Sequence, residues 1–196
     1  MSVQINDLWK KSYSIEELNF LAENMLIEIM PTVKTTMKDN LNLVCGSFDN
    51  LKPNKKMNLP IWMAVKIRQK SKCKIYPPYF MEISYLKEHI ELEKKNVEIL
   101  MPLPYYFFEI IHILSYKAQQ DIPGIEEIKN YCADISIIRN DKINNIITKI
   151  KEDKYFFKIK NICARELEVI RPIIVELLNS GDKFFNLINN IENKYN

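Results

Sequence analysis

Histidine and cysteine, which often act as bases, nucleophiles and metal ligands, are few in this chain of 196 residues. A metal site needs His, Cys, Asp or Glu at short spacings, and a nucleophilic site needs a base close to a Ser or Cys. The 2 histidines and 4 cysteines are His89, His112, Cys45, Cys73, Cys132 and Cys163. The cysteines form no C-x-x-C pair, and the histidines fall on different predicted helices. We therefore predict no catalytic residue, no metal ligand and no cofactor.

Known catalytic motifs are also missing. The chain contains no G-x-S-x-G, H-E-x-x-H, phosphate-loop or dinucleotide-binding pattern. His112 lies within an apolar run, so we expect a core histidine there rather than a ligand. The sequence predicts that the protein is not an enzyme, and a small enzyme with a Cys/His site stays the weaker alternative.

A run of alternating basic residues is the first candidate binding feature. It comprises Lys66, Arg68, Lys70, Lys72 and Lys74. If the run is extended, these charges share one face and could follow a phosphate backbone or an acidic protein surface. The other interpretation is a solvated strand edge whose lysines discourage strand pairing. A formal net charge of only +3 favours the solvated edge or an acidic protein partner over direct DNA binding.

The second candidate feature is the apolar run "MPLPYYFFEIIHIL" at residues 101–114. It is too short to span a bilayer, which takes about 20 apolar residues, so we expect no membrane contact. Consecutive residues point to all sides of a helix. Folding of this chain alone therefore explains only some of the four aromatic residues, which are Tyr105, Tyr106, Phe107 and Phe108. We expect a neighbouring chain to cover the others.

The elements that position these residues divide into two groups. Ser14 and Glu17 form a capping box that predicts a helix to about Ala22. Alternating residues predict strands at 25–30, 41–45 and 73–76, with a helix that starts near Pro60. After residue 80 the apolar spacing is helical, with helices predicted over 83–97, 104–118, 125–138 and 155–170. Pro172 should break the last of these, and a short helix should follow near 184–191.

The predicted fold class is α+β and mainly α. We divide the chain into an N-terminal extension (1–13), a small α/β B domain (14–78) and a helical A domain (79–196) of about five helices. The stiff pair Pro77–Pro78 marks the boundary. We find no signal peptide, so we expect reduced thiols in the cytosol or nucleus.

Four blocks of the sequence resemble a known family in content, order and spacing. They are "FLAENMLIEIMP" (20–31), "LPIWMAVKIRQKSKCKIYPPYFM" (59–81), "MPLPYYFFEI" (101–110) and "DIPGIEEIKNYCADISIIRNDKI" (121–143). These blocks resemble the second partner-of-Sld-five family of subunits of the eukaryotic GINS complex. The similarity is weaker around residues 177–190. Residues 1–13 have no recognised counterpart in the family.

The resemblance implies a non-catalytic scaffold in DNA replication. Such a subunit joins three sister subunits in a heterotetramer, which binds the MCM ring and the cell-division-cycle protein forty-five in the nuclear replicative helicase. DNA contact would be indirect or weak. In this family the B domain precedes the A domain, in agreement with the boundary at Pro77–Pro78. Asp134 and Arg139 match a pattern of GINS subunits, and the resemblance implies that both lie at a subunit interface. We expect Arg139 to make a buried or interfacial carboxylate pair.

Overall fold

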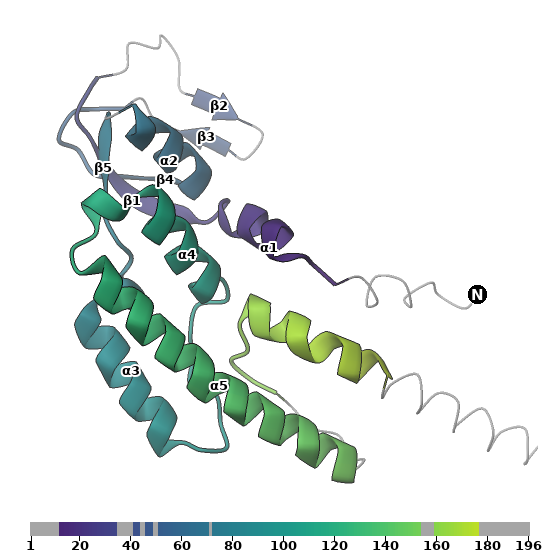
Figure 1. Cartoon of the computed structure of the whole chain (residues 1–196). Coiled ribbons are helices and arrows are strands. Elements are labelled where there is room, and N and C mark those ends of the chain that lie inside the picture. Colours follow the sequence, from purple (N-terminus) through teal and green to yellow (C-terminus); the bar gives the residue numbers. More distant parts are fainter. Residues whose placement is uncertain are drawn as a thin grey trace, which may run out of the picture.

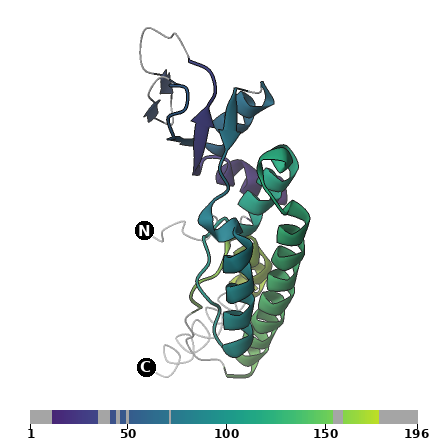
Figure 2. The ribbon, with the colours of Figure 1, turned by 90° about the vertical axis from the view of Figure 1, so that its left-hand side faces the viewer.

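The structure is a computed structural model that describes residues 12–34, 41–43, 46–48, 51–70, 72–153 and 159–176. It has the α+β, mainly α fold that the sequence predicts. A small sheet with one helix beside it lies at one end of the molecule, and long helices extend away from it (Figures 1 and 2). Within the described part, no helix combines the length and apolar composition that a membrane crossing requires.

Strand β1 (Leu26–Pro31) is the centre of the three-stranded sheet. It pairs antiparallel with β4 (Met57–Pro60) on one side and β5 (Cys73–Ile75) on the other. Its alternate residues Ile27 and Ile29 are buried, as the period of two predicts. A separate antiparallel pair joins β2 (Leu41–Leu43) to β3 (Gly46–Phe48). Strands β3 and β4 are not predicted from the sequence.

Helix α1 (Ile15–Ala22) begins with the predicted capping box. The hydroxyl of Ser14 accepts a hydrogen bond from the Glu17 N–H at 3.2 Å, and the Glu17 carboxylate accepts one from the Ser14 N–H at 2.9 Å. Helix α2 (Ile61–Gln69) follows β4 directly, with Pro60 at its N-cap. Residues 66–69 are therefore helical, so the first half of the basic run is not the extended segment that one interpretation required.

The second part of the chain is helical. A short 3₁₀ turn, η1 (Tyr79–Met81), leads into α3 (Ile83–Lys95). Helix α4 (Phe107–Lys117) follows, then the 3₁₀ turn η2 (Gln119–Asp121) and α5 (Ile125–Asp153). Helices α3 and α5 pack along each other (Figure 1).

Two predicted helix boundaries are wrong. Helix α5 continues well past residue 138, because Ile143 and Ile147 extend the buried stripe at four-residue spacing. In the described residues the following helix covers 164–176 and passes through Pro172, whereas residues 159–163 of the predicted range are not helical. Its start is set by Glu166, whose carboxylate accepts a hydrogen bond from the Cys163 N–H at 2.9 Å. The short helix predicted near 184–191 lies outside the described residues.

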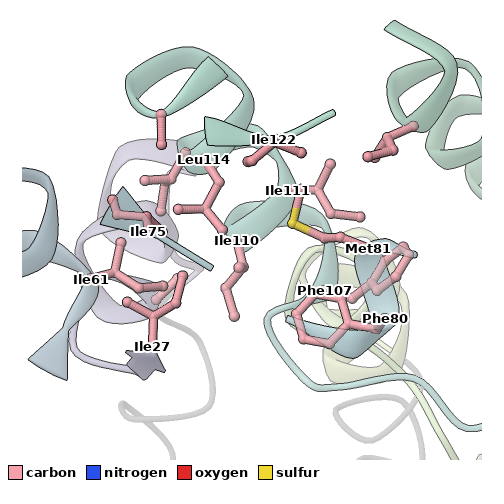
Figure 3. Close-up of a cluster of buried hydrophobic side chains, with 14 of the residues drawn as sticks. Ile27, Ile61, Ile75, Phe80, Met81, Phe107, Ile110, Ile111, Leu114 and Ile122 are labelled. Atoms are coloured by element: carbon pink, nitrogen blue, oxygen red, sulfur yellow. The ribbon is translucent and has the colours of Figure 1, made fainter. Parts of the chain in front are cut away.

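One hydrophobic core joins the sheet to the helices. Figure 3 shows Ile110 and Leu114 of α4 between sheet-side residues, including Ile27 and Ile75, and helix-side residues such as Phe107. A second, smaller cluster comprises Leu100, Ile143, Ile147 and Ile170. The division of the chain at residue 78 stays a prediction.

Candidate functional site

The aromatic run divides into a buried pair and a more exposed pair. Phe107 and Phe108 open α4 and are buried, and the Phe107 ring lies 5.7 Å from the ring of Phe80. Tyr105 and Tyr106 precede the helix, where Tyr105 is 46% exposed and Tyr106 is partly buried. Two of the four rings therefore complete this chain's own core, and the two tyrosines remain candidates for contact with a neighbour.

Helices α1 and α4 also present apolar side chains to solvent. Phe20 of α1 is 69% exposed and Tyr116 of α4 is 86% exposed. The two helices pack together, and Lys117 Nζ lies 2.5 Å from Glu23 Oε1 across their junction. His112 is exposed one turn before Tyr116, so the prediction of a core histidine is wrong. The reason is its place on the one side of α4 that neither the sheet nor α5 covers.

Arg139 of α5 is the centre of a buried ion network and has no exposed surface. Its Nε and Nη2 donate to the two carboxylate oxygens of Glu166 at 2.6 and 2.8 Å. Its Nη1 donates to Glu93 Oε1 at 2.6 Å and to the Met101 carbonyl at 2.8 Å. A further bond from Nη2 reaches the Asn161 carbonyl at 2.7 Å. All five guanidinium donors are thus used.

Glu93 of α3 is the second centre of this network. Lys142 Nζ donates to its carboxylate and also to the Ile99 carbonyl at 3.1 Å. His89 Nε2 lies 3.4 Å from Glu93 Oε1. Burial by itself would raise the pKa of Glu93, but His89, Lys142 and Arg139 together outweigh it and lower that pKa to about 2. Two cations and two carboxylates balance, so each buried charge has a partner.

The network fixes the segments on both sides of the tyrosines. Asn161 has a positive φ of 60°, and its amide donates to the Leu100 carbonyl at 2.9 Å. The Ala164 N–H donates to the Tyr105 carbonyl at 2.8 Å. Through Arg139, Glu93 and Glu166 the network ties α3, α5, the 96–104 loop and the 164–176 helix together, and so determines where Tyr105 lies.

The outcome for the predicted site residues on α5 is mixed. Arg139 does make a buried carboxylate pair, and its partners belong to its own chain. Asp134 is exposed on α5 and lies outside the network. Sequence reasoning missed Glu93, although its spacing from Leu86 and Ile90 places a carboxylate on the buried stripe of α3. The expected positions of Arg139 and Asp134 at a subunit interface stay predictions.

The basic run separates into one internal residue and four exposed ones. Arg68 Nε lies 2.5 Å from Asp121 Oδ2, and its Nη2 donates to Gln120 Oε1 at 3.1 Å. The same Asp121 oxygen accepts a hydrogen bond from the Ile75 N–H at 3.1 Å. Arg68 thus joins α2 to the outer edge of β5 through η2. The exposed members of the run are Lys66, Lys70, Lys72 and Lys74.

One buried charge is poorly compensated. Glu109 of α4 has no exposed surface, and neither of its carboxylate oxygens has a hydrogen-bond partner among the described residues. The closest cation is Arg165, whose Nε lies 3.8 Å away. Burial raises the pKa of the Glu109 carboxyl above its ordinary value, and the charge of Arg165 only partly opposes this.

Side chains arranged for catalysis or metal binding are scarce in the described part of the chain. The described part of the chain has no cluster of three or more His, Cys, Asp or Glu side chains arranged for a metal ion. Burial raises the pKa of the Cys73 and Cys132 thiols to about 11 in each case. Such thiols stay protonated at neutral pH, and the thiolate is the reactive form.

Comparison with known proteins identifies the family. The family model described as the PSF2 N-terminal domain matches residues 14–76, and the model described as the GINS complex protein helical bundle domain matches residues 77–185. The DNA replication complex GINS protein psf2 of Schizosaccharomyces pombe is 34% identical over 168 residues, which cover 86% of this chain and 88% of that protein. The human DNA replication complex GINS protein PSF2 is 27% identical over 165 residues, which cover 83% of this chain and 87% of the human protein. The chain belongs to the PSF2 family of GINS complex subunits.

Proposed function

We propose that this protein is a non-catalytic scaffold subunit of a heterotetrameric GINS complex. In this proposal one copy joins three sister subunits in the nucleus. The complex then acts in initiation and elongation of DNA replication with the MCM ring and the cell-division-cycle protein forty-five. The relatives support the first step, because they are named as DNA replication complex GINS proteins.

The main support for the scaffold role is the exposure of large apolar side chains on α1 and α4, two helices that also pack against the rest of the protein. Ile15 and Phe20 of α1 and Tyr116 of α4 are mostly exposed, although the other aromatic and aliphatic residues of α4 are buried in the common core. Aromatic side chains are enriched at protein interfaces. We assign Phe20, Tyr116 and Tyr105 to contacts with sister subunits.

The ion network has a supporting part in this proposal. A guanidinium with all donors used and two buried carboxylates stabilises one arrangement of the 96–104 loop and the 164–176 helix. An interface that is preformed in this way loses less conformational freedom when a partner binds. Arg139 therefore acts from inside the subunit, by positioning Tyr105.

The scarcity of reactive side chains among the described residues supports a scaffold more than an enzyme. The described cysteines are Cys73, Cys132 and Cys163, and burial raises the pKa of each thiol. The alternative, a nucleic-acid-binding protein that uses residues 66–74, loses support because Arg68 is engaged with Asp121 and residues 66–69 are helical.

Co-expression tests the scaffold role directly. The tagged chain is produced with its three sister subunits, and the purified assembly is measured by native mass spectrometry. The double variant Phe20→Ser/Tyr116→Ser should reduce the yield of the four-subunit complex strongly. A matched double variant at exposed polar positions, Lys95→Ser/Lys129→Ser, should leave the yield unchanged. Equal yields for both variants, or a wild-type chain that recovers no sister subunit, would contradict the proposal.

A further inference from the structure

An excess of positive charge is concentrated in one segment of this chain. Residues 51–78 contain eight basic residues and no Asp or Glu, although the whole chain has a net charge of only +3. The rest of the chain therefore has 20 basic and 25 acidic residues and a net charge of −5. This segment includes β4, α2 and β5, so the positive charge belongs to the end of the molecule that carries the sheet (Figure 1).

The fold pairs two of these eight residues internally. Arg68 contacts Asp121, and Lys56 Nζ lies 2.8 Å from Glu28 Oε2. Apart from these two paired residues, the segment has a set of exposed lysines. No ion pair to a described carboxylate is found for the members of this set, which are Lys52, Lys55, Lys66, Lys70, Lys72 and Lys74.

Backbone hydrogen bonds gather several of these lysines around the end of β1. The Thr32 N–H donates to the Lys72 carbonyl at 2.9 Å, and the Asn54 N–H donates to the Pro31 carbonyl at 3.0 Å. These bonds place the turn at 52–55 and the α2–β5 connection on either side of Pro31. Lys34 follows β1 at the same end and is also exposed. We call Lys34, Lys55, Lys70 and Lys72 the lysine end of the sheet.

We propose that the lysine end binds a short, extended acidic segment of a further protein. This inference deepens the proposed scaffold function, on which it rests, by assigning a partner chemistry to one surface. These four lysines lie around one end of β1, and no described carboxylate is found paired with Lys55, Lys70 or Lys72. Such a compact group of positive charges matches a short run of Asp and Glu side chains.

The same residues fit nucleic acid less well. The lysine end has no arginine for bidentate phosphate contacts, because Arg68 is engaged with Asp121. Among the described residues it has no exposed aromatic ring on which a base could stack. The nearby Tyr76 ring is half-buried, with Lys56 4.6 Å and Lys74 5.8 Å from its centre. The net negative charge of the rest of the chain also opposes a long polyanion more than a short peptide.

A binding experiment on the assembled four-subunit complex tests the proposal. The probe is a fluorescein-labelled ten-residue peptide of alternating Asp and Glu, and its anisotropy is followed at low and high salt. The reference probes are a Gln/Asn peptide of the same length and DNA oligonucleotides, both single-stranded and duplex. Complex carrying Lys55→Gln/Lys70→Gln/Lys72→Gln should bind the acidic peptide about tenfold more weakly, as expected for the loss of three exposed charge pairs. Salt should reduce the difference.

The control variant removes the same charge elsewhere. Lys94, Lys95 and Lys160 are exposed outside the 51–78 segment. Complex with Lys94→Gln/Lys95→Gln/Lys160→Gln should bind the acidic peptide within about twofold of wild type, because distant charges are screened. The proposal would be overturned if both triple variants lost the same affinity for the acidic peptide, or if the wild-type complex did not bind the peptide. It would also be overturned if the wild-type complex bound DNA more tightly than the peptide and the Lys55/Lys70/Lys72 variant abolished that DNA binding. Native mass spectrometry of every sample reports assembly separately, so failure of the scaffold function is distinguishable.

Discussion

Arg139 uses all five of its guanidinium N–H groups in hydrogen bonds inside the protein, and its removal leaves the buried Glu166 carboxylate without its cation. In an Arg139→Met variant, Glu166 would lose both of its guanidinium contacts while staying buried. Breaking a buried pair from one side costs about 3–5 kcal/mol. We therefore expect a large fall in the melting temperature of the co-expressed complex. Lys129→Met at an exposed position of the same helix should change stability by less than about 0.5 kcal/mol. Similar melting temperatures for the two variants would show that the network is dispensable.

Glu93 predicts an acid limit to stability. Its pKa in the folded protein is about 2, below the ordinary value of 4.5. A lowered carboxyl pKa contributes stability above the unfolded-state value, and that contribution is lost as the pH falls from about 4.5 towards 2. Glu93→Gln should melt below the wild type at pH 7, and the difference in melting temperature should narrow as the pH falls from about 4.5 towards 2. A gap that stays constant over this range would contradict the assignment. Glu91→Gln, at an exposed position of the same helix, serves as the control.

Glu109 predicts the opposite pH dependence. Burial raises the pKa of this carboxyl in the folded state. The contribution of Glu109 to the stability of the protein is therefore highest below the unfolded-state pKa, where the carboxyl is protonated, and it falls as the pH rises through the folded-state pKa and the buried carboxylate ionises. Glu109→Gln removes the charge and retains the shape of the side chain. This variant should melt above the wild type at pH 7 and lose the advantage below about pH 4.5, the ordinary value for Glu. Glu126→Gln, which is exposed, should show no gain. A Glu109→Gln variant that melts lower at pH 7 would indicate that Arg165 compensates the charge fully.

At the scale of secondary-structure elements, the Arg68–Asp121 pair covers the outer edge of β5. An open strand edge is a template for unwanted pairing, and here Asp121 accepts the N–H of Ile75 from outside the sheet. Arg68→Ala should cost about 1–3 kcal/mol, because it leaves the largely buried Asp121 carboxylate without its cation. Lys66→Ala on the same helix should be nearly neutral. Hydrogen exchange at Ile75 is the most direct measurement, and it should accelerate only in the Arg68→Ala variant.

Elements that depend on local chemistry could be predicted from the sequence. The capping box of α1, the alternating burial of β1 and the mainly helical second part are examples. Elements that depend on distant partners could not. Strand β4 has only four residues and is a strand because β1 lies beside it. The helix at 164–176 keeps Pro172 because its packing and its Glu166 cap outweigh one lost hydrogen bond.

The same distinction applies to the candidate site. Arg139 could be predicted as a buried cation, but Glu93 and Glu166 are 46 and 27 residues away in sequence, and only the fold brings them together. Exposure is equally non-local. His112 and Phe107 belong to the same apolar run, yet the first is exposed and the second has no exposed surface, because the fold covers every side of α4 except the one that carries His112 and Tyr116.

At the scale of the whole molecule, the exposed apolar side chains predict that the chain is poorly soluble alone. Monomeric soluble proteins rarely expose contiguous apolar patches beyond a few hundred Å². Phe20, Tyr105 and Tyr116 are among the large apolar residues that the described surface exposes. We expect the chain expressed alone to self-associate, as measured by light scattering, and to become monodisperse when its three sister subunits are co-expressed.

A matched variant separates interface exposure from weak folding as the cause of self-association. Phe20→Ser/Tyr116→Ser removes two exposed rings and leaves the buried core unchanged, so the lone variant should scatter less light than the lone wild type and unfold at a similar temperature. Phe107→Ala instead removes a fully buried ring at a cost of about 3–5 kcal/mol and should increase aggregation. Obligate subunits gain part of their stability from interface burial. A lone wild-type chain that is monomeric and unfolds cooperatively at high concentration would show that this subunit needs no partner to cover α1 and α4.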